Sequence, residues 1–151
     1  MQIHSTRFGE VDIPEQHILH FAQGLPGFPE QPGFAFLPYG DESPFAFLQS
    51  TSDPDLTFLI VEPFAVLSDY SFELNDDEAA ELGLSPENPP QVFAIVSLKE
   101  NLATSTVNLL APVIVNWVNR QAKQIILEKS IYTTKQLLFP AGIPDQSEGG
   151  K

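Results

Sequence analysis

The chain of 151 residues is long enough for one domain with its own core. Its 42% hydrophobic content, with twelve Phe, excludes a disordered acidic protein. The formal net charge of −13 is unevenly divided, because residues 1–90 carry sixteen acidic residues and one basic residue, Arg7. Such a field repels nucleic acids and anionic membranes and favours basic or polar protein partners, so we expect a protein-binding module.

Composition also restricts the compartment and the domain organisation. The chain has no Cys, which excludes a disulfide framework and a thiolate metal site. Residues 1–10 lack the apolar core of a signal peptide, and no apolar stretch is long enough to cross a bilayer. We therefore expect a cytoplasmic protein with a single domain over residues 1–140. The polar, glycine-containing residues 141–151 are expected to form a disordered tail.

Short β-prone runs separated by Pro, Gly and Asp predict strands throughout the first half of the chain. The expected strands are residues 2–7, 10–13, 18–21, 34–37, 45–49 and 57–61. The segment Leu25-Pro26-Gly27-Phe28-Pro29 is too rich in Pro and Gly for a strand, and we expect a turn that exposes or tucks in Leu25 and Phe28. The alternation of Tyr70, Phe72 and Leu74 with polar residues predicts a further, half-buried strand.

One short helix has clear start and stop signals. Asn75 is a good N-cap, and Glu78 stands three residues later, as in a capping box. Asp76 and Asp77 fall in the first turn, where the helix dipole favours negative charge. Gly83 is placed to end the helix.

The second half returns to strands. The expected runs are residues 91–98, 104–116, 124–127 and 131–139, the last as a strand or a docked tail. Pro112 interrupts the second run and predicts an edge position or a bulge there. Eight or more short strands with one or two short helices predict a mainly β fold: a small antiparallel barrel, closed or nearly closed.

Residue patterns for catalysis and metal binding are weak. His17 and His20 stand three apart in a predicted strand, which places them on opposite faces. The acid pairs are explained by turns and by helix capping, and the sequence contains no Gly-x-Ser-x-Gly motif and no phosphate-binding loop. We expect no catalytic, metal or cofactor site. The alternative is a small β protein that binds or cleaves carbohydrate with surface aromatics and paired acids.

Aromatic residues allow two interpretations. The Phe residues in predicted strands should mostly fill the barrel, whereas Phe28, Tyr39 and Tyr70 lie in or beside turns. Aromatic residues next to acids are typical of a protein-binding patch, and the alternative is that these side chains fold back onto the barrel.

A series of turn and strand motifs resembles the FliW family of flagellar assembly factors. The motifs occur in order from residue 2 to residue 137, and they include Gly24-Leu25-Pro26-Gly27-Phe28, Asp53-Pro54-Asp55-Leu56-Thr57-Phe58, Asn108-Leu109-Leu110-Ala111-Pro112-Val113-Ile114-Val115-Asn116 and Tyr132-Thr133-Thr134-Lys135. A single such motif would be weak, but the whole series is specific.

The resemblance implies a non-enzymatic, cofactor-free cytoplasmic protein that binds two partners in alternation, and we expect it to be a monomer when free. The partners are flagellin, before its export, and CsrA, the RNA-binding repressor of flagellin translation. For flagellin we expect a groove lined by Phe28, Tyr39, Phe45 and Tyr70. The full set of expected partner contacts is Leu25, Phe28, Tyr39, Asp41, Glu42, Phe45, Asp69, Tyr70, Glu73, Asn108 and Asn116.

Overall fold

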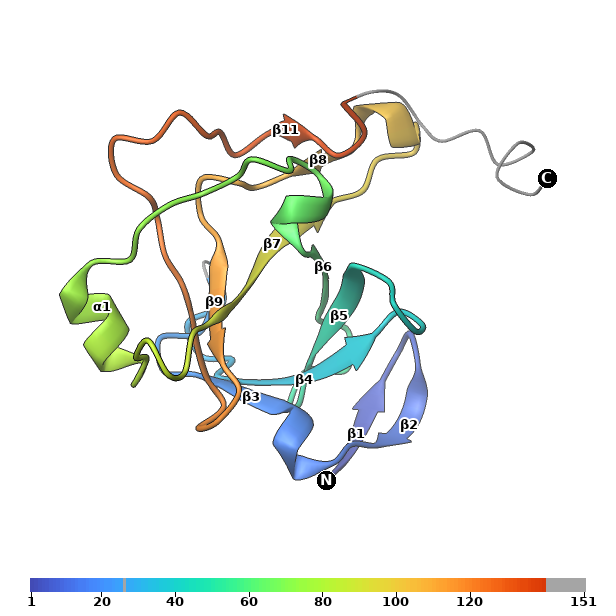
Figure 1. Ribbon diagram of the computed structural model, residues 1–151. Coiled ribbons are helices and arrows are strands. Elements are labelled where there is room, and N and C mark those ends of the chain that lie inside the picture. Colours follow the sequence, from blue (N-terminus) through green and yellow to red (C-terminus); the bar gives the residue numbers. More distant parts are fainter. Residues whose placement is uncertain (26, 141–151) are drawn as a thin grey trace.

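Seven strands close into a barrel in the computed structural model of the chain, which describes residues 1–25 and 27–140 (Figure 1). The order around the barrel is β3 (Ile18–Phe21), β4 (Gly33–Pro38), β5 (Phe45–Ser50), β6 (Thr57–Val61), β7 (Gln91–Ser97), β9 (Val113–Asn116) and β10 (Gln121–Gln124), which returns to β3. All pairs around the barrel are antiparallel except β10 with β3, which run parallel. The predicted barrel is confirmed, with one parallel pair that alternation does not reveal.

The remaining elements lie outside the barrel. A hairpin of β1 (Gln2–Ser5) and β2 (Gly9–Asp12) packs beside β4, and β8 (Thr106–Val107) and β11 (Gln136–Leu137) extend the sheet beyond β7. The helices are α1 (Asp76–Glu81) and three single 3-10 turns at Glu15–His17, Pro63–Ala65 and Leu102–Thr104. None of the helices in the described parts of the chain has the length and apolarity needed to cross a membrane. The predicted tail, residues 141–151, lies outside the described residues.

Helix α1 forms as its sequence predicts. The Asn75 side chain accepts a hydrogen bond from the Glu78 amide at 2.8 Å, and its Nδ2 donates to the Glu78 carboxylate at 2.9 Å. This is the reciprocal capping box. Gly83 follows the last turn with a φ of 71°, which favours glycine.

Three strand predictions are wrong in part, and one is wrong altogether. Residues 104–116 contain two strands, β8 and β9, and Pro112, which has no N–H to donate to a sheet, lies directly before β9. The predicted edge position is wrong, because β9 is paired on both sides. The strand predicted at 124–127 lies at Gln121–Gln124 instead, and of 131–139 only Gln136–Leu137 is a strand. Residues 70–74 keep their alternating burial but form no strand.

The core inside the barrel contains side chains from all seven strands, including Leu19, Phe21, Phe34, Leu48, Ile60, Phe93 and Val113. Alternation decides which side chains enter. In β5, Ala46 and Leu48 point inward, whereas Phe45 and Phe47 lie on the outer face and are only half-buried. The expectation that the strand phenylalanines mostly fill the barrel is wrong for these two.

The outside of the barrel is covered in three places. The β1–β2 hairpin covers Ala35, and α1 with its flanking residues covers Ile114 and Ile125. The chain around residues 66–72 and 127–139 covers Val61, Ala94 and Val96. These three covers leave much of the outer face of β5 and β6 open.

Candidate functional site: an apolar groove on the outer face of the barrel

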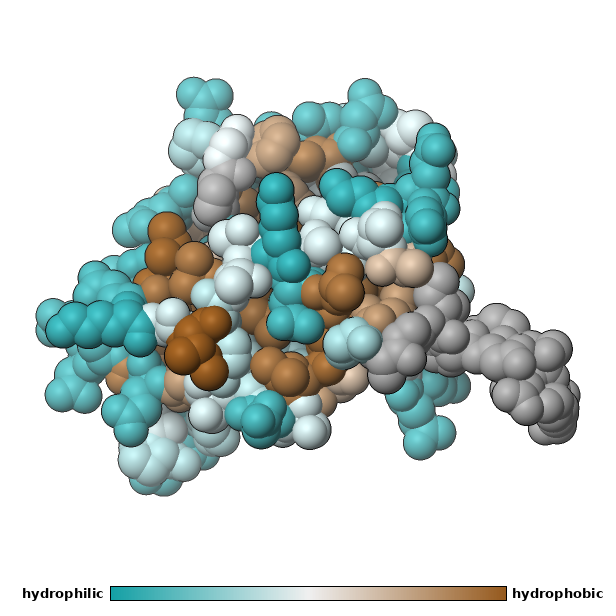
Figure 2. All heavy atoms as spheres, turned by 90° about the horizontal axis from the view of Figure 1, so that it is seen from above, coloured by the Kyte–Doolittle hydropathy of each residue, from teal (hydrophilic) through white to brown (hydrophobic). Residues whose placement is uncertain are grey.

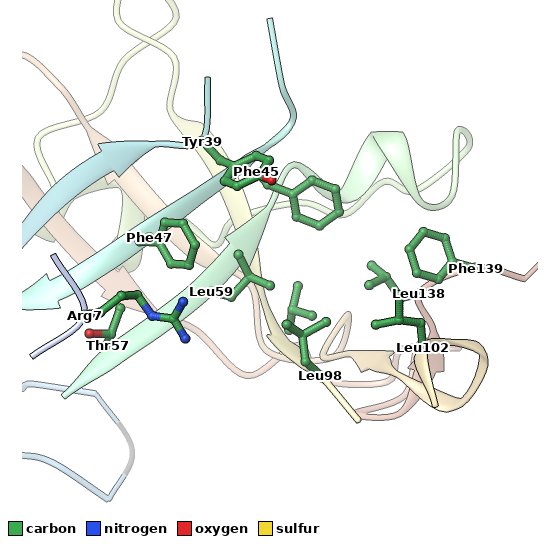
Figure 3. Close-up of a pocket in the computed structure, with 11 residues that line it drawn as sticks. Arg7, Tyr39, Phe45, Phe47, Thr57, Leu59, Leu98, Leu102, Leu138 and Phe139 are labelled. Carbon is green, nitrogen blue, oxygen red and sulfur yellow. The ribbon is translucent and has the colours of Figure 1, made fainter. Parts of the chain in front are cut away.

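A groove of about 420 Å³ lies where the outer face of the barrel is left uncovered (Figure 3). Its floor comes from β5, β6 and β7, through Phe45, Phe47, Thr57, Leu59 and Val96. The residues at its sides come from four separate parts of the chain: Arg7, Tyr39, the pair Leu98 and Leu102, and the pair Leu138 and Phe139. The barrel therefore acts as a platform that collects side chains far apart in sequence.

Strand register places the floor residues together. Phe47 is opposite Leu59 on β6, and Leu59 is opposite Val96 on β7, so the three side chains form a row across the sheet. Phe45 stands two residues before Phe47 and shares its face. The sequence alternation that fills the barrel with Ala46 and Leu48 thus also builds the groove.

Aromatic contacts fix one end of the groove. The Phe47 ring meets the rings of Phe8 and Tyr39 edge-on, with centroids at 5.2 and 6.1 Å. The guanidinium carbon of Arg7 lies 5.4 Å from the centre of the same ring, which is a cation–π distance. Within the described residues no carboxylate lies within ion-pair distance of Arg7. The end of this apolar groove therefore carries Arg7, the one Lys or Arg of residues 1–90.

The rim exposes large apolar side chains. Tyr39 is 62% exposed, Leu98 56% and Leu102 44%. Asp41 and Glu42 are exposed on the loop that joins Tyr39 to Phe45, so acids border the groove at this corner. Clustered aromatics and leucines with a polar border are typical of a surface that binds protein. Within the described residues there is no group of His, Cys, Asp or Glu that could hold a metal ion.

The structure divides the predicted contact residues. Tyr39 and Phe45 line the groove, and Asp41 and Glu42 lie on its bordering loop. Phe28 is exposed but lies elsewhere, with its ring edge-on to Phe58 at 5.8 Å. Asp69 and Glu73 are exposed and do not line this groove; Glu73 lines a second groove.

Tyr70 cannot belong to the predicted four-aromatic groove, because only 2% of it is exposed. Its hydroxyl donates to the Leu109 carbonyl at 2.8 Å, and its ring packs against Tyr132 with centroids 4.5 Å apart. Burial, and secondarily the neighbouring Tyr132, raise the pKa of the Tyr70 phenol well above its ordinary value. The prediction of a surface contact is wrong here. The alternation of residues 70–74 predicts which way Tyr70 points, but it does not predict the residues that cover the side chain.

Leu25 and Asn116 are buried as well, which corrects the prediction that they contact a partner. Leu25 belongs to the barrel core, as a tucked-in turn residue would. The Asn116 side chain donates to the Leu82 carbonyl at 2.7 Å and accepts from Asn88 Nδ2 and the Val118 amide at 3.0 and 2.9 Å. It ties β9 to the end of α1.

Asn108 is half-buried and holds a turn. Its Oδ1 accepts from the amides of Leu110 and Ala111 at 3.1 and 3.0 Å. The asparagines at both ends of the Asn108–Asn116 motif are thus explained by local structure.

Sequence reasoning missed most of the groove. Arg7, Phe47 and Leu59 carried a usable signal, since Phe47 and Leu59 fall on the outward parity of their strands and Arg7 is an isolated base. Leu98, Leu102, Leu138 and Phe139 carried none, because they reach the groove only through the placement of β8 and β11.

Comparisons with known proteins agree along nearly the whole chain. The family model described as FliW protein matches residues 2–138. A flagellar assembly factor FliW of Desulfitobacterium hafniense (strain Y51) is 47% identical over 152 residues, with all of both chains covered. That of Bacillus subtilis (strain 168) is 41% identical over 135 residues, which cover 89% of this chain and 94% of the relative. A crystal structure of the flagellar assembly factor FliW superimposes with a TM-score of 0.85 at 35% identity, and the match covers 93% of this chain and 98% of the other.

Proposed function

The chain belongs to the FliW family of flagellar assembly factors, a family of binding proteins and not of enzymes, and on this premise we propose that it works as a partner switch. In the cytoplasm it binds flagellin. When flagellin is scarce, it binds CsrA instead and relieves the repression of flagellin translation. The free protein is a monomer.

The open apolar groove is the observation that carries the flagellin half of the proposal. The chain covers the barrel elsewhere with a hairpin, a helix and two extended segments, but it leaves Tyr39, Leu98 and Leu102 in solvent. Exposed apolar side chains that converge on one groove are costly in water unless a partner covers them. A groove of about 420 Å³ accepts several side chains of a protein segment.

Net charge supports the CsrA half. CsrA binds RNA and presents basic surface to it, whereas this chain carries a net charge of −13. An acidic protein docked beside the RNA site repels the phosphate backbone without filling that site. Added salt should therefore weaken the complex.

A competition titration tests the switch. The protein is mixed with the organism's CsrA bound to labelled flagellin leader RNA, and flagellin is then added. The proposal expects release of RNA by the protein and its return to CsrA when flagellin is added. If the protein binds flagellin and never releases RNA, the CsrA half is wrong.

Neutralising the acids tests the repulsion itself. Several exposed Asp and Glu residues are replaced by Asn and Gln in one variant. RNA displacement by this variant should weaken even at concentrations that saturate CsrA. Undiminished displacement would contradict like-charge exclusion.

The groove has a matched pair of variants. Leu98→Asp places a charge at its exposed rim and should weaken flagellin binding at least about tenfold. Val118→Asp makes the same chemical change at a side chain that is 78% exposed and does not line the groove, so flagellin binding should stay unchanged. Flagellin binding is measured by calorimetry on variants whose unfolding midpoints are unchanged. If the two variants weaken binding equally, flagellin binds outside this groove.

A further inference from the structure

The segment from Tyr70 to Leu74 has the burial pattern of a strand and yet belongs to no sheet. Tyr70 is buried, Phe72 and Leu74 are half-buried, and Ser71 and Glu73 between them are exposed. In Figure 1 this segment crosses the upper left of the molecule, between the turn Pro63–Ala65 and α1. We propose that it is an unpaired strand edge that accepts an extended, basic segment of a partner protein by β-strand addition.

Side chains rather than main-chain hydrogen bonds hold the segment in place. Phe72 packs into two apolar clusters, one shared with Tyr70 and the other with Leu74. The Ser71 amide donates to the Tyr132 hydroxyl at 2.9 Å. Among the described residues, the main-chain N–H and C=O groups of Phe72, Glu73 and Leu74 have no hydrogen-bond partner in the protein. A fixed extended segment with free N–H and C=O groups is what strand addition requires.

Space for an added strand lies beside this edge. A groove of about 490 Å³ is lined by Ser71, Phe72 and Glu73 on one side and by residues 127–132 on the other. The two sides meet where the rings of Tyr70 and Tyr132 pack together. Ile131, on the far side, is 88% exposed. Figure 2 looks down on the end of the molecule that carries β8 and β11, and it shows brown apolar patches separated by polar side chains.

Charge selects the occupant. Glu73 and Glu128 line the groove, and Asp69 and Asp76 are exposed just before and after the segment, against a single base, Lys129. A strand with Lys or Arg at alternate positions pairs with these acids, while the apolar residues between them contact Phe72, Leu127 and Ile131. A second copy of this chain, itself at −13, is repelled.

This edge is separate from the apolar groove of the proposed flagellin site. The two grooves share no lining residue. Strand addition at this edge therefore goes beyond the proposed function, and different variants test the edge and the flagellin groove.

The test uses a capped peptide of alternating Lys and Val as the probe and amide exchange by NMR as the readout. At low salt, saturating peptide should slow exchange at alternate amides of the segment, either that of Glu73 or those of Phe72 and Leu74, at least about tenfold, because only alternate N–H groups of a strand face the same neighbour. The same peptide N-methylated at alternate residues should give no protection, since it cannot complete the ladder. A peptide with Glu in place of Lys should not bind.

Two charge reversals sharpen the test. Glu73→Lys should weaken peptide binding about fivefold. Glu87→Lys makes the same change at an exposed acid outside this groove and should leave binding unchanged. Three results would overturn the proposal: the N-methylated peptide binds as tightly as the parent, the protected amides belong to another strand, or the two charge reversals have equal effects. Protection of residues 72–74 in the free protein that grows with its concentration would make a second copy the occupant, and would overturn it too.

Discussion

The hydroxyl of Tyr70 is a single group whose contribution to stability can be calculated and measured. It is buried, it donates to the Leu109 carbonyl at 2.8 Å, and within the described residues that carbonyl has no other donor. Tyr70→Phe keeps the ring, and with it the packing against Phe64, Phe72 and Tyr132. The substitution therefore removes one buried hydrogen bond and creates almost no cavity.

The expected cost follows from the carbonyl left without a donor. An unsatisfied buried acceptor costs about 1–3 kcal/mol, so the free energy of unfolding should fall by roughly 2 kcal/mol. For a domain of this size that corresponds to a decrease in Tm of roughly 6 °C. Urea unfolding followed by circular dichroism measures it, and the m-value should not change, because the surface exposed on unfolding is the same.

Tyr39→Phe is the matched control. Tyr39 is mostly exposed, and its hydroxyl makes no hydrogen bond within the described part of the protein. Its removal should change the free energy of unfolding by less than about 0.5 kcal/mol. If Tyr70→Phe is as mild as Tyr39→Phe, the Tyr70 hydroxyl does not hold the 66–75 segment to the barrel, and the packing argument for that segment loses its polar anchor.

Three further predictions use the same unfolding assay. The raised pKa of Tyr70 means that its contribution is complete below a pH of about 10, the ordinary pKa of tyrosine. Above that pH, stability should fall by up to about 1.4 kcal/mol per pH unit, and Tyr70→Phe should flatten the decline. Gly24→Ala should cost at least about 2 kcal/mol, because Gly24 has a φ of +64° and an added Cβ would lie 2.3 Å from the Phe28 carbonyl oxygen; Gly40→Ala, with a φ of +77° and open space around it, should cost only about 1 kcal/mol. Asn116→Ala should cost about 3 kcal/mol and speed amide exchange in α1, and unchanged exchange there would show that this side chain does not hold the helix.

Local sequence patterns predicted the first half of the fold well, and the reason is topological. β3 and β6 have the predicted bounds, and β1, β2, β4 and β5 differ from theirs by one or two residues. These strands follow one another in chain order and, from β3 onward, each pairs with the next, so turn signals and alternation contain most of the needed information. The capped helix α1 was predictable for the same local reason.

The second half depends on contacts that local patterns do not carry. β10 is polar at three of its four residues and is a strand only because β9 and β3 flank it, whereas local apolarity predicts the strand at residues 124–127, over the run that follows. The segment 70–74 shows the opposite case: its alternation is genuine, but no neighbouring strand pairs with it. Alternation reports which side is buried, and only the tertiary structure decides whether a neighbouring strand is present.

The candidate site was predictable only where it is local. Tyr39, Asp41, Glu42 and Phe45 belong to one loop and its flanks, and a search for aromatics beside acids finds them together. Tyr70 meets the same criterion and is buried, because part of its cover, Tyr132 included, comes from residues far along the chain. Surface aromatics cannot be told from covered ones until the distant chain is placed.

The two grooves share no lining residue, but they rest on one core. One cluster, which contains Val61, Tyr70 and Leu109 among others, packs against side chains of both grooves: Phe45 and Phe139 of the apolar groove, and Phe72 and Tyr132 of the groove beside the strand edge. A partner that repacks Phe45 therefore acts on side chains that also hold the 70–74 segment. Two partners bound in these grooves would exclude each other only through a steric clash between them or through such a repacking. A partner can shift the balance between two packings of the core only as far as its affinities for the two packings differ. Binding a short peptide in one groove and a whole protein in the other separates the two causes. The peptide is too small to clash with the protein, so any remaining exclusion comes from the repacking.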